Sequence, residues 1–370
     1  MKPKIAVVLN AAWNIYNFRL PLMRFLRDSG YDVIAIAPKD GYEERIKAEG
    51  FEFYDIELCP KGTNPIKDLK TVFALFGLYK KLQPVVVLHY TAKPNIYGNF
   101  AAFLANVPAV NTVTGLGTLF LSDSLSLKIG RFLYRLAFLS SAKVLFQNPD
   151  DMKLFFDTGL VKPEKTGLVH GSGIDESHFY YSKKEHSGSP FVFLLVARML
   201  KDKGVLEFVE AARELKGKGY NAVFRLIGSA EAKNPTAIGI DEITEWKKEG
   251  VVEYMGQTDD VRSAIVESDC VVLPSYREGL PRTLLEAASM GRPMVATDAP
   301  GCRELVFDGV NGFLCKIKDS KDLSLAMEKM LLASDEERTA MGHYSREMIC
   351  DKFSSLKIAE AYFETIKKIS

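Results

Sequence analysis

Two series of short, uninterrupted apolar segments alternate with helical segments along this chain. In the first half of the sequence the apolar segments are 5–9, 33–37, 85–88, 109–113 and 144–146. A strand that is apolar on both faces has to be covered on both faces, so such segments are typical of a parallel sheet with helices on either side. The repeated order of strand and helix predicts an α/β fold.

The alternation starts again after a polar segment, residues 171–190, which is rich in Gly, Ser and Lys and has the composition of a linker. The second series of apolar segments is 191–197, 223–227, 251–254, 270–273 and 294–297. A chain of 370 residues is long enough for two cores. We therefore predict two Rossmann-like domains, 1–175 and 176–350, with parallel sheets that face each other across a cleft, and a terminal helix, 351–370.

The motif S-Y-R-E-G-L-P-R-T-L-L-E-A at 275–287 follows one of these strands and opens a helix. Gly279 lets the backbone approach a ligand closely, and Pro281 suits the first helical turn, where its missing N–H is not needed. Ligands of parallel sheets bind beyond the carboxyl ends of the strands. The amides of Gly279, Leu280 and the helix start are therefore expected to hold a diphosphate.

Two carboxylates flank this loop. Glu278 stands before it and is placed to accept hydrogen bonds from sugar hydroxyls, while Glu286 lies within the helix and is placed to accept them from paired ribose hydroxyls. The alternative is that both are surface carboxylates beside an ordinary loop. The order of strand, loop and helix favours the functional interpretation.

A second motif, A-R-M-L-K-D-K-G at 197–204, also follows a strand. We expect Arg198 and Lys203 to face the cleft, with Lys201 as a substitute. A guanidinium and an ammonium together can stabilise the negative charge of a departing diphosphate without a metal ion. Arg and Lys after a strand are usually solvated, so this pair alone is a weak signal. The presence of the first motif strengthens its interpretation as a diphosphate site.

Glycine and small residues follow two further strands. Gly256, within 254–261, ends a strand before a helix, and a nucleotide base could lie against this backbone; a capped turn is the alternative. Ala12, within 9–19, lets a ligand come near the first strand. This loop lacks the G-x-G-x-x-G pattern of dinucleotide-binding sites, which argues against a dehydrogenase.

Four residues of the first half are candidates for the acceptor side. Arg19 could bind an acceptor phosphate or be a structural cation. His89, at a strand end, could steer the attacking hydroxyl, although a lone histidine is often structural. Lys93 follows it in H-Y-T-A-K-P-N, and Thr114 opens a glycine loop, 114–118, after another strand.

Charge and cysteine content exclude several classes of protein. A formal net charge of +1 argues against a nucleic-acid binder, and five cysteines without paired spacing argue against disulfides and structural zinc. No D-x-D motif or histidine cluster indicates a metal site. Residues 61–143 contain ten Lys and Arg against two Asp; they suit an anionic lipid surface or a pyrophosphate, or are solvated helix faces. We identify no signal peptide or membrane-spanning segment.

The motifs resemble those of the retaining family 4 glycosyltransferases of the GT-B fold, in the bacterial subfamily that assembles surface polysaccharides and lipid-linked oligosaccharides. The resemblance rests on Arg198 with Lys203, on E-G-L-P followed by Glu286, and on N-P-D-D, G-S-G-I-D and D-A-P-G-C-R-E-L elsewhere in the chain. It departs in the first loop, where Ala11-Ala12 replaces the Gly-Gly that many members have.

The resemblance implies that Arg198 and Lys203 bind the donor diphosphate, Glu286 the ribose, and Glu278 with the 279–281 amides the donor sugar. It also implies that the C-terminal helix crosses back to the N-terminal domain. We expect metal-independent, retaining transfer of a hexose or N-acetylhexosamine, such as N-acetylgalactosamine, from a UDP-sugar to a polyprenyl-diphosphate-linked acceptor. No cofactor is expected.

The expected location is the cytoplasm, peripheral at the inner face of the cell membrane. A nucleotide-sugar epimerase of the same fold and a non-catalytic nucleotide-sugar-binding protein are the alternatives.

Overall fold

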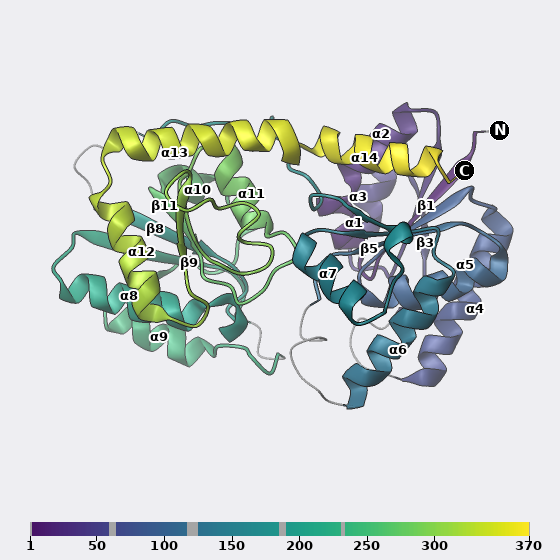
Figure 1. The fold of residues 1–370 in the computed structure, drawn as a ribbon, viewed down its shortest axis with the longest axis horizontal. Helices are drawn as coiled ribbons and strands as arrows, with labels where there is room; N and C mark the ends of the chain where they lie inside the picture. The colour runs from purple at the N-terminus through teal and green to yellow at the C-terminus, as the bar shows by residue number, and fades with distance from the viewer. Residues whose placement is uncertain (1, 59–63, 117–124, 185–189, 231–233, 370) are drawn as a thin grey trace. The chain divides into compact units, whose positions relative to one another are not determined.

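The structure is a computed structural model that describes residues 2–58, 64–116, 125–184, 190–230 and 234–369. Its contacts divide the chain into two compact units (Figure 1). The first unit is Met1–Gly173 together with Ser355–Ser370, and the second is Ile174–Ser354. Each unit contains one sheet of parallel strands, which confirms the predicted α/β fold of two Rossmann-like parts.

The first sheet has the strand order β3-β2-β1-β4-β5-β6-β7. Its strands are β1 (Lys4–Val8), β2 (Asp32–Ala37), β3 (Glu52–Asp55), β4 (Val86–Tyr90), β5 (Ala109–Val113), β6 (Lys143–Phe146) and β7 (Thr166–Leu168). The order reverses between β1 and β4, which makes that point of the carboxyl edge the expected ligand position.

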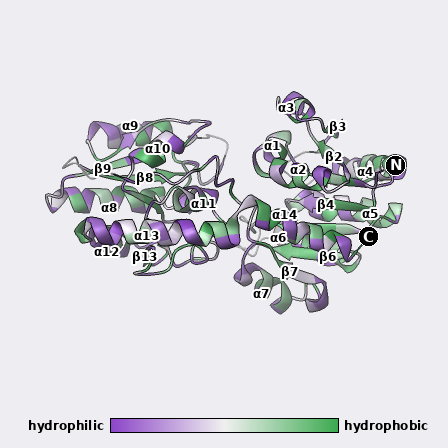
Figure 2. Cartoon of the chain, turned by 90° about the horizontal axis from the view of Figure 1, so that it is seen from above, coloured by the Kyte–Doolittle hydropathy of each residue, from purple (hydrophilic) through white to green (hydrophobic). Residues whose placement is uncertain are grey.

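Helices cover both faces of this sheet, as the apolar strands require (Figures 1 and 2). One face packs against α1 (Ala12–Phe18), α2 (Leu20–Asp28) and α14 (Ser355–Lys367), and the other against α4 (Pro65–Leu82) and α5 (Asn99–Ala105). The remaining helices are α3 (Glu43–Ala48), the π-helical turn η1 (Pro94–Gly98), α6 (Leu125–Leu139), α7 (Pro149–Asp157) and η3 (Pro163–Lys165).

The C-terminal helix α14 belongs to the first unit, although the chain reaches it from the second. The Tyr362 hydroxyl lies 2.8 Å from Oγ1 of Thr112, and both side chains are buried. The ring of Phe363 packs edge-on against Phe25, with 5.8 Å between centroids. This helix therefore completes the apolar cover of the first sheet.

The second sheet has the order β10-β9-β8-β11-β12-β13 and reverses between β8 and β11. Its strands are β8 (Phe191–Val196), β9 (Ala222–Ile227), β10 (Glu253–Tyr254), β11 (Cys270–Leu273), β12 (Met294–Thr297) and β13 (Gly312–Cys315). The helical segments are η4 (Lys201–Lys203), α8 (Val205–Gly217), α9 (Ile240–Lys248), α10 (Arg262–Glu267), α11 (Arg282–Ser289), α12 (Ser320–Leu332), α13 (Asp335–Met348) and η5 (Ile349–Phe353).

The sequence predicts His89 at the end of a strand. In the structure it lies within β4 instead, and its side chain is fully buried. Its Nδ1 lies 2.9 Å from Oδ1 of Asn111 and its Nε2 lies 2.9 Å from the Tyr79 hydroxyl. The Asn111 amide nitrogen donates to Asn99 and Ser141, so its oxygen faces His89. Nδ1 therefore donates to Asn111, and in the neutral ring Nε2 accepts from the Tyr79 hydroxyl.

Burial lowers the pKa of His89 from 6.5 to about 4. Between these two pH values the unfolded chain binds a proton that the folded chain does not, so the folded state is destabilised as the pH falls. The contribution of this group to stability is complete above pH 6.5 and is lost on acidification toward pH 4.

We predict that His89→Gln, which keeps an acceptor and a donor but does not titrate, flattens this pH dependence. Between pH 7.5 and pH 4, the free energy of unfolding should fall by about 3 kcal/mol less in the variant than in the unmodified protein. Chemical denaturation at a series of pH values measures this, with the exposed His343→Gln as the control. Equal pH slopes in both variants would refute the assigned protonation state.

Candidate functional site

The candidate donor site lies at the carboxyl edge of the second sheet, where the strand order reverses. The segment after β8 contains Arg198 and Lys203, and the segment after β11 contains Glu278. Because β8 and β11 are parallel neighbours, with Cys270 opposite Phe193, these segments leave the sheet side by side. Such a reversal point is the usual ligand position in doubly wound sheets.

Backbone contacts fasten the two segments to each other. The amide of Tyr276 donates to the carbonyl of Asp202 at 3.0 Å, and the Ser275 hydroxyl donates to the same carbonyl at 3.2 Å. Gly204 has φ +71, and a Cβ built there would lie 2.1 Å from the carbonyl oxygen of Pro274. Only glycine fits this approach, so the residue sets the spacing of the two loops.

Lys203 and Glu278 form an ion pair across this junction. The ammonium nitrogen lies 2.5 Å from Oε1 of Glu278, and the two side chains are 17% and 16% exposed. The Glu278 amide donates to the carbonyl of Pro300, from the loop after β12, at 2.9 Å. The structure therefore brings together the predicted cation and the predicted sugar-binding carboxylate.

The loop 279–281 leads from this pair into α11. Gly279 and Pro281 are buried and Leu280 is half-buried. Pro281 is the N-cap of the helix, which begins one residue later, at Arg282. The amides of this helix start therefore belong to the carboxyl edge of the sheet, as the prediction for a diphosphate requires.

Glu286 is buried in α11 and is 8% exposed. Its Oε1 accepts a hydrogen bond from Nε of Arg282 at 3.0 Å, one helical turn earlier. Desolvation raises the pKa of Glu286, and the Arg282 cation opposes this shift. Sequence reasoning missed Arg282, although its i, i+4 spacing to the glutamate is a signal that could have found it.

The other two predicted donor-side residues flank the same edge. Arg198 is exposed just past β8, and in the described part of the chain its guanidinium forms no ion pair. Gly256 follows β10 with φ +76, and its carbonyl accepts from the amide of Gly228 at 2.8 Å. A backbone hydrogen bond thus joins the loops after β9 and β10.

In the first unit, Ala12 begins α1 and is fully buried. Arg19 joins α1 to α2 and is 4% exposed, with its guanidinium carbon 4.0 Å from the centroid of the Tyr90 ring. Its Nε has no hydrogen-bond partner among the described residues. Tyr90 ends β4, so Arg19 lies at the reversal point of the first sheet.

Lys93 lies beyond β4 but points to a protein partner. Its ammonium lies 2.6 Å from Oδ1 of Asp68, whose other oxygen accepts from the Tyr97 hydroxyl at 2.9 Å. This pairing makes Lys93 a structural cation in the present conformation. Thr114 is half-buried directly after β5, while residues 117 and 118 of its glycine loop lie outside the described residues.

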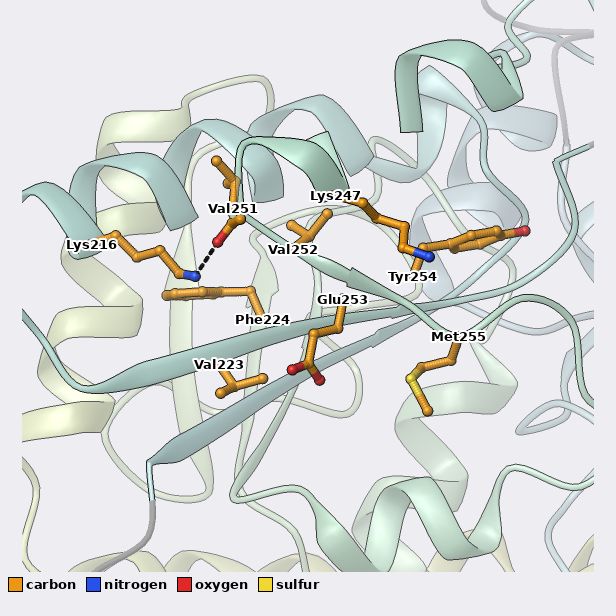
Figure 3. A pocket seen from close by; sticks show the side chains of 10 residues that line it. Lys216, Val223, Phe224, Lys247, Val251, Val252, Glu253, Tyr254 and Met255 are labelled. Atoms are coloured by element: carbon orange, nitrogen blue, oxygen red, sulfur yellow. Dashed lines mark hydrogen bonds between the residues drawn. The ribbon is translucent and has the colours of Figure 1, made fainter. Parts of the chain in front are cut away.

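The candidate site is separate from one concave part of the described surface. A hollow in the second unit lies beside the edge strand β10 and is lined by Lys216, Phe224, Lys247 and residues 250–255 (Figure 3). In it, the Lys216 ammonium donates to the carbonyl of Gly250 (Figure 3). The site is therefore assigned from the chemistry of its residues and the sheet topology rather than from the shape of the surface.

Two kinds of feature are absent from the described residues. They contain no group of three or more His, Cys, Asp or Glu side chains that could hold a metal ion. Within the same residues, no helix combines the length and apolar character needed to cross a bilayer.

Each of the two units matches a known protein family. A family of "Glycosyl transferase 4-like" domains matches residues 4–148, and "Glycosyl transferases group 1" matches residues 178–348. Among solved structures, the glycosyltransferase of Rickettsia africae has a TM-score of 0.81 at 17% identity and covers 100% of this chain and 98% of its own. Anabaena Alr3699/HepE in complex with UDP has a TM-score of 0.79 at 18% identity and covers 100% of both chains.

Two curated relatives extend along most of the chain. The Campylobacter jejuni N,N'-diacetylbacillosaminyl-diphospho-undecaprenol alpha-1,3-N-acetylgalactosaminyltransferase is 31% identical, over 90% of this chain and 90% of its own. The Escherichia coli UDP-Gal:alpha-D-GlcNAc-diphosphoundecaprenol alpha-1,3-galactosyltransferase is 27% identical, over 92% of this chain and 90% of its own. These similarities define an enzyme that transfers sugars. The chain belongs to the family 4 glycosyltransferases of the GT-B fold.

We predict that Gly204→Ala separates the loops after β8 and β11. The new methyl group meets the Pro274 carbonyl, so stability should fall by about 2–4 kcal/mol. Gly219→Ala is the matched control, because Gly219 has φ +84 but open space around it, and it should cost about 1 kcal/mol. Thermal unfolding compares the two, and equal losses would contradict the close approach.

Proposed function

We propose that this enzyme transfers a sugar from a UDP-sugar with retention of anomeric configuration. In this proposal Arg198, Lys203 and the amides at the start of α11 bind the diphosphate, Glu278 with the backbone of 279–281 binds the donor sugar, and Glu286 binds the ribose. The Lys203–Glu278 pair at the reversal point of the second sheet is the observation that carries the proposal. The Anabaena complex with UDP, and the E. coli relative whose name includes UDP-Gal, support the choice of nucleotide.

The chemistry follows from where charge develops. The bond between the anomeric carbon and the β-phosphate oxygen breaks, and a bond from the acceptor oxygen to the same face of that carbon forms. The proton of the acceptor hydroxyl passes to the departing β-phosphate. Lys203 and Arg198 stabilise the negative charge that builds on this phosphate, and Glu278 orients Lys203 toward it.

We further propose a polyprenyl-diphosphate-linked acceptor that binds the first unit, near Arg19 and Thr114. The C. jejuni and E. coli relatives both have diphosphoundecaprenol acceptors in their names. Arg19 is buried, its Nε has no hydrogen-bond partner among the residues that the structure describes, and it is the residue of this unit best suited to a phosphate. Such an acceptor places the enzyme at the inner face of the cell membrane. Donor sugars of the hexose or N-acetylhexosamine class, N-acetylgalactosamine among them, are consistent with these relatives.

We predict that Lys203→Ala and Glu278→Ala each lower kcat for sugar transfer by roughly 10²–10³, the loss typical of one electrostatic contact to a transition state. Transfer from radiolabelled UDP-sugars to a diphosphate-linked acceptor measures this. Lys218→Ala is the control, because it removes another ion pair of the second unit, at 3.0 Å from Glu328. Near-normal turnover in both site variants would exclude the assignment, provided that thermal unfolding shows them folded.

We predict that Arg282→Gln makes UDP binding more sensitive to pH. Burial already raises the pKa of Glu286, and loss of the neighbouring cation raises it further, so the carboxyl protonates at a higher pH and stops accepting ribose hydroxyls. UDP affinity should therefore fall more between pH 8 and pH 6 than in the unmodified enzyme. Asp260, which also raises this pKa, stays in place in every variant.

Calorimetric titration with UDP measures the effect. Arg282→Lys keeps the charge and should restore the normal pH dependence, while Glu286→Gln should bind UDP weakly at both pH values. An Arg282→Gln enzyme with unchanged affinity at pH 6 would show that Arg282 does not support Glu286. Comparing variants cancels the titration of UDP itself.

A further inference from the structure

Three helices of the first unit expose an unusual number of large apolar side chains. Nine of the 21 such side chains in the described residues lie on α4, α5 and α6. Their exposed fractions run from 39% for Leu136 to 70% for Ile66. They are Ile66, Leu69, Phe73, Phe103, Leu104, Ile129, Phe132, Leu136 and Leu139. Grouped exposed apolar residues of this kind mark interaction surfaces.

The spacing in α6 shows that its apolar stripe faces away from the protein. Ile129, Phe132 and Leu136 are separated by three and four residues and are exposed, whereas Tyr134 and Phe138 are buried in the core. At about 100° per residue these two sets point to roughly opposite sides of the helix. Burial inside this unit therefore accounts for one side of α6 only.

The three helices lie next to one another. α4 contacts α5 (Figure 1). Both α4 and α6 contact the turn η1. α4 and α6 follow β3 and β5 in the chain, so both helices start at the carboxyl edge of the first sheet, the edge of Arg19 and Thr114. We call the exposed surface of α4, α5 and α6 the apolar–basic face.

The charges on this face have one sign. The three helices contain seven basic residues, Lys67, Lys70, Lys80, Lys81, Lys128, Arg131 and Arg135. Their one acidic residue is Asp68, which is buried and bonded to Lys93 and Tyr97. In α6 each of the three basic residues immediately precedes an exposed apolar one. Arg131 is half-buried, and the other six cations are exposed on helices that have no second carboxylate.

We propose that the apolar–basic face docks onto a bilayer that contains anionic lipid. Such a surface offers apolar chains to the nine apolar side chains and phosphates to the flanking cations in one plane. A second copy of this chain would instead set like charges against each other. The choice of a bilayer over another acidic partner rests on the proposed function, because docking along α4 and α6 brings the acceptor residues of the first sheet close to the lipid.

Flotation of the full-length protein with vesicles tests this proposal. Vesicles of phosphatidylcholine and phosphatidylglycerol in equal parts should carry the protein upward at low salt, and pure phosphatidylcholine should carry much less. The double variant Ile129→Ser/Phe132→Ser should reduce binding by roughly tenfold or more, because it removes two inserting side chains. Lys128→Gln/Arg135→Gln should bind more weakly and lose much of the salt dependence.

Leu332→Ser is the matched control, because Leu332 is 70% exposed on α12, in the second unit, where acidic and basic residues alternate. It should float like the unmodified protein. Absence of flotation on the anionic vesicles, or flotation of the double variant equal to that of Leu332→Ser, would overturn the proposal. A dimer in solution that the double variant dissociates, without vesicle binding, would assign the face to a second copy and overturn it too.

UDP binding separates this result from the proposed function. The Ile129→Ser/Phe132→Ser variant should bind UDP like the unmodified protein and should transfer sugar to a short-chain, water-soluble acceptor at the same rate. Failure of the unmodified protein to bind UDP would remove the proposed donor site and leave the vesicle result intact.

Discussion

The parallel pairing of β8 with β11 is the constraint on which the candidate donor site depends. Their hydrogen bonds set Cys270 beside Phe193 and Val271 beside Leu194, so the segments that follow both strands emerge at one edge. Lys203 and Glu278 are 75 residues apart in sequence, yet they meet because of this pairing. Gly204 then allows the backbones to approach until the carbonyls and amides of the two loops bond. The ion pair is a consequence of the sheet.

Each carboxylate of this site is matched by a cation from the protein. Lys203 forms an ion pair with Glu278, and Arg282 forms one with Glu286. All four side chains are largely buried or half-buried. Burial raises the pKa of Glu286 and the neighbouring Arg282 cation opposes this shift, so Arg282 favours the ionised carboxylate that accepts hydrogen bonds. In the proposed donor site a nucleotide diphosphate would bring negative charge to the same place, and Lys203 would contact it by giving up part of its interaction with Glu278. The pair is thus suited to exchange a protein anion for a substrate anion.

The fold could be predicted largely because strands buried on both faces leave a plain apolar signal. The short edge strands β7 and β13 were missed, since they have few residues and weak apolar patterns. The positions of candidate site residues could be predicted where they follow strands, since Lys203 and Glu278 do lie together at one edge of the sheet. His89 and Lys93 could not be judged, because their partners Asn111 and Asp68 lie more than 20 residues away in sequence. Burial and pairing of a polar side chain depend on contacts that spacing alone does not show.

In the first unit, the cations of one sequence window divide between an internal ion pair and the surface. The sequence window 61–143 has ten cations, but Lys93 turns inward to Asp68 and so contributes no net charge to the surface. The cations of α4 and α6 have no such acid on their helices, and they alternate with apolar residues that the core does not need. A solvated helix face would have no reason to keep Phe73, Phe132 and Leu139 exposed, because polar residues at these positions would leave the buried side of each helix unchanged. The exposed apolar residues, more than the charges, are therefore what distinguishes a docking face from an ordinary basic surface.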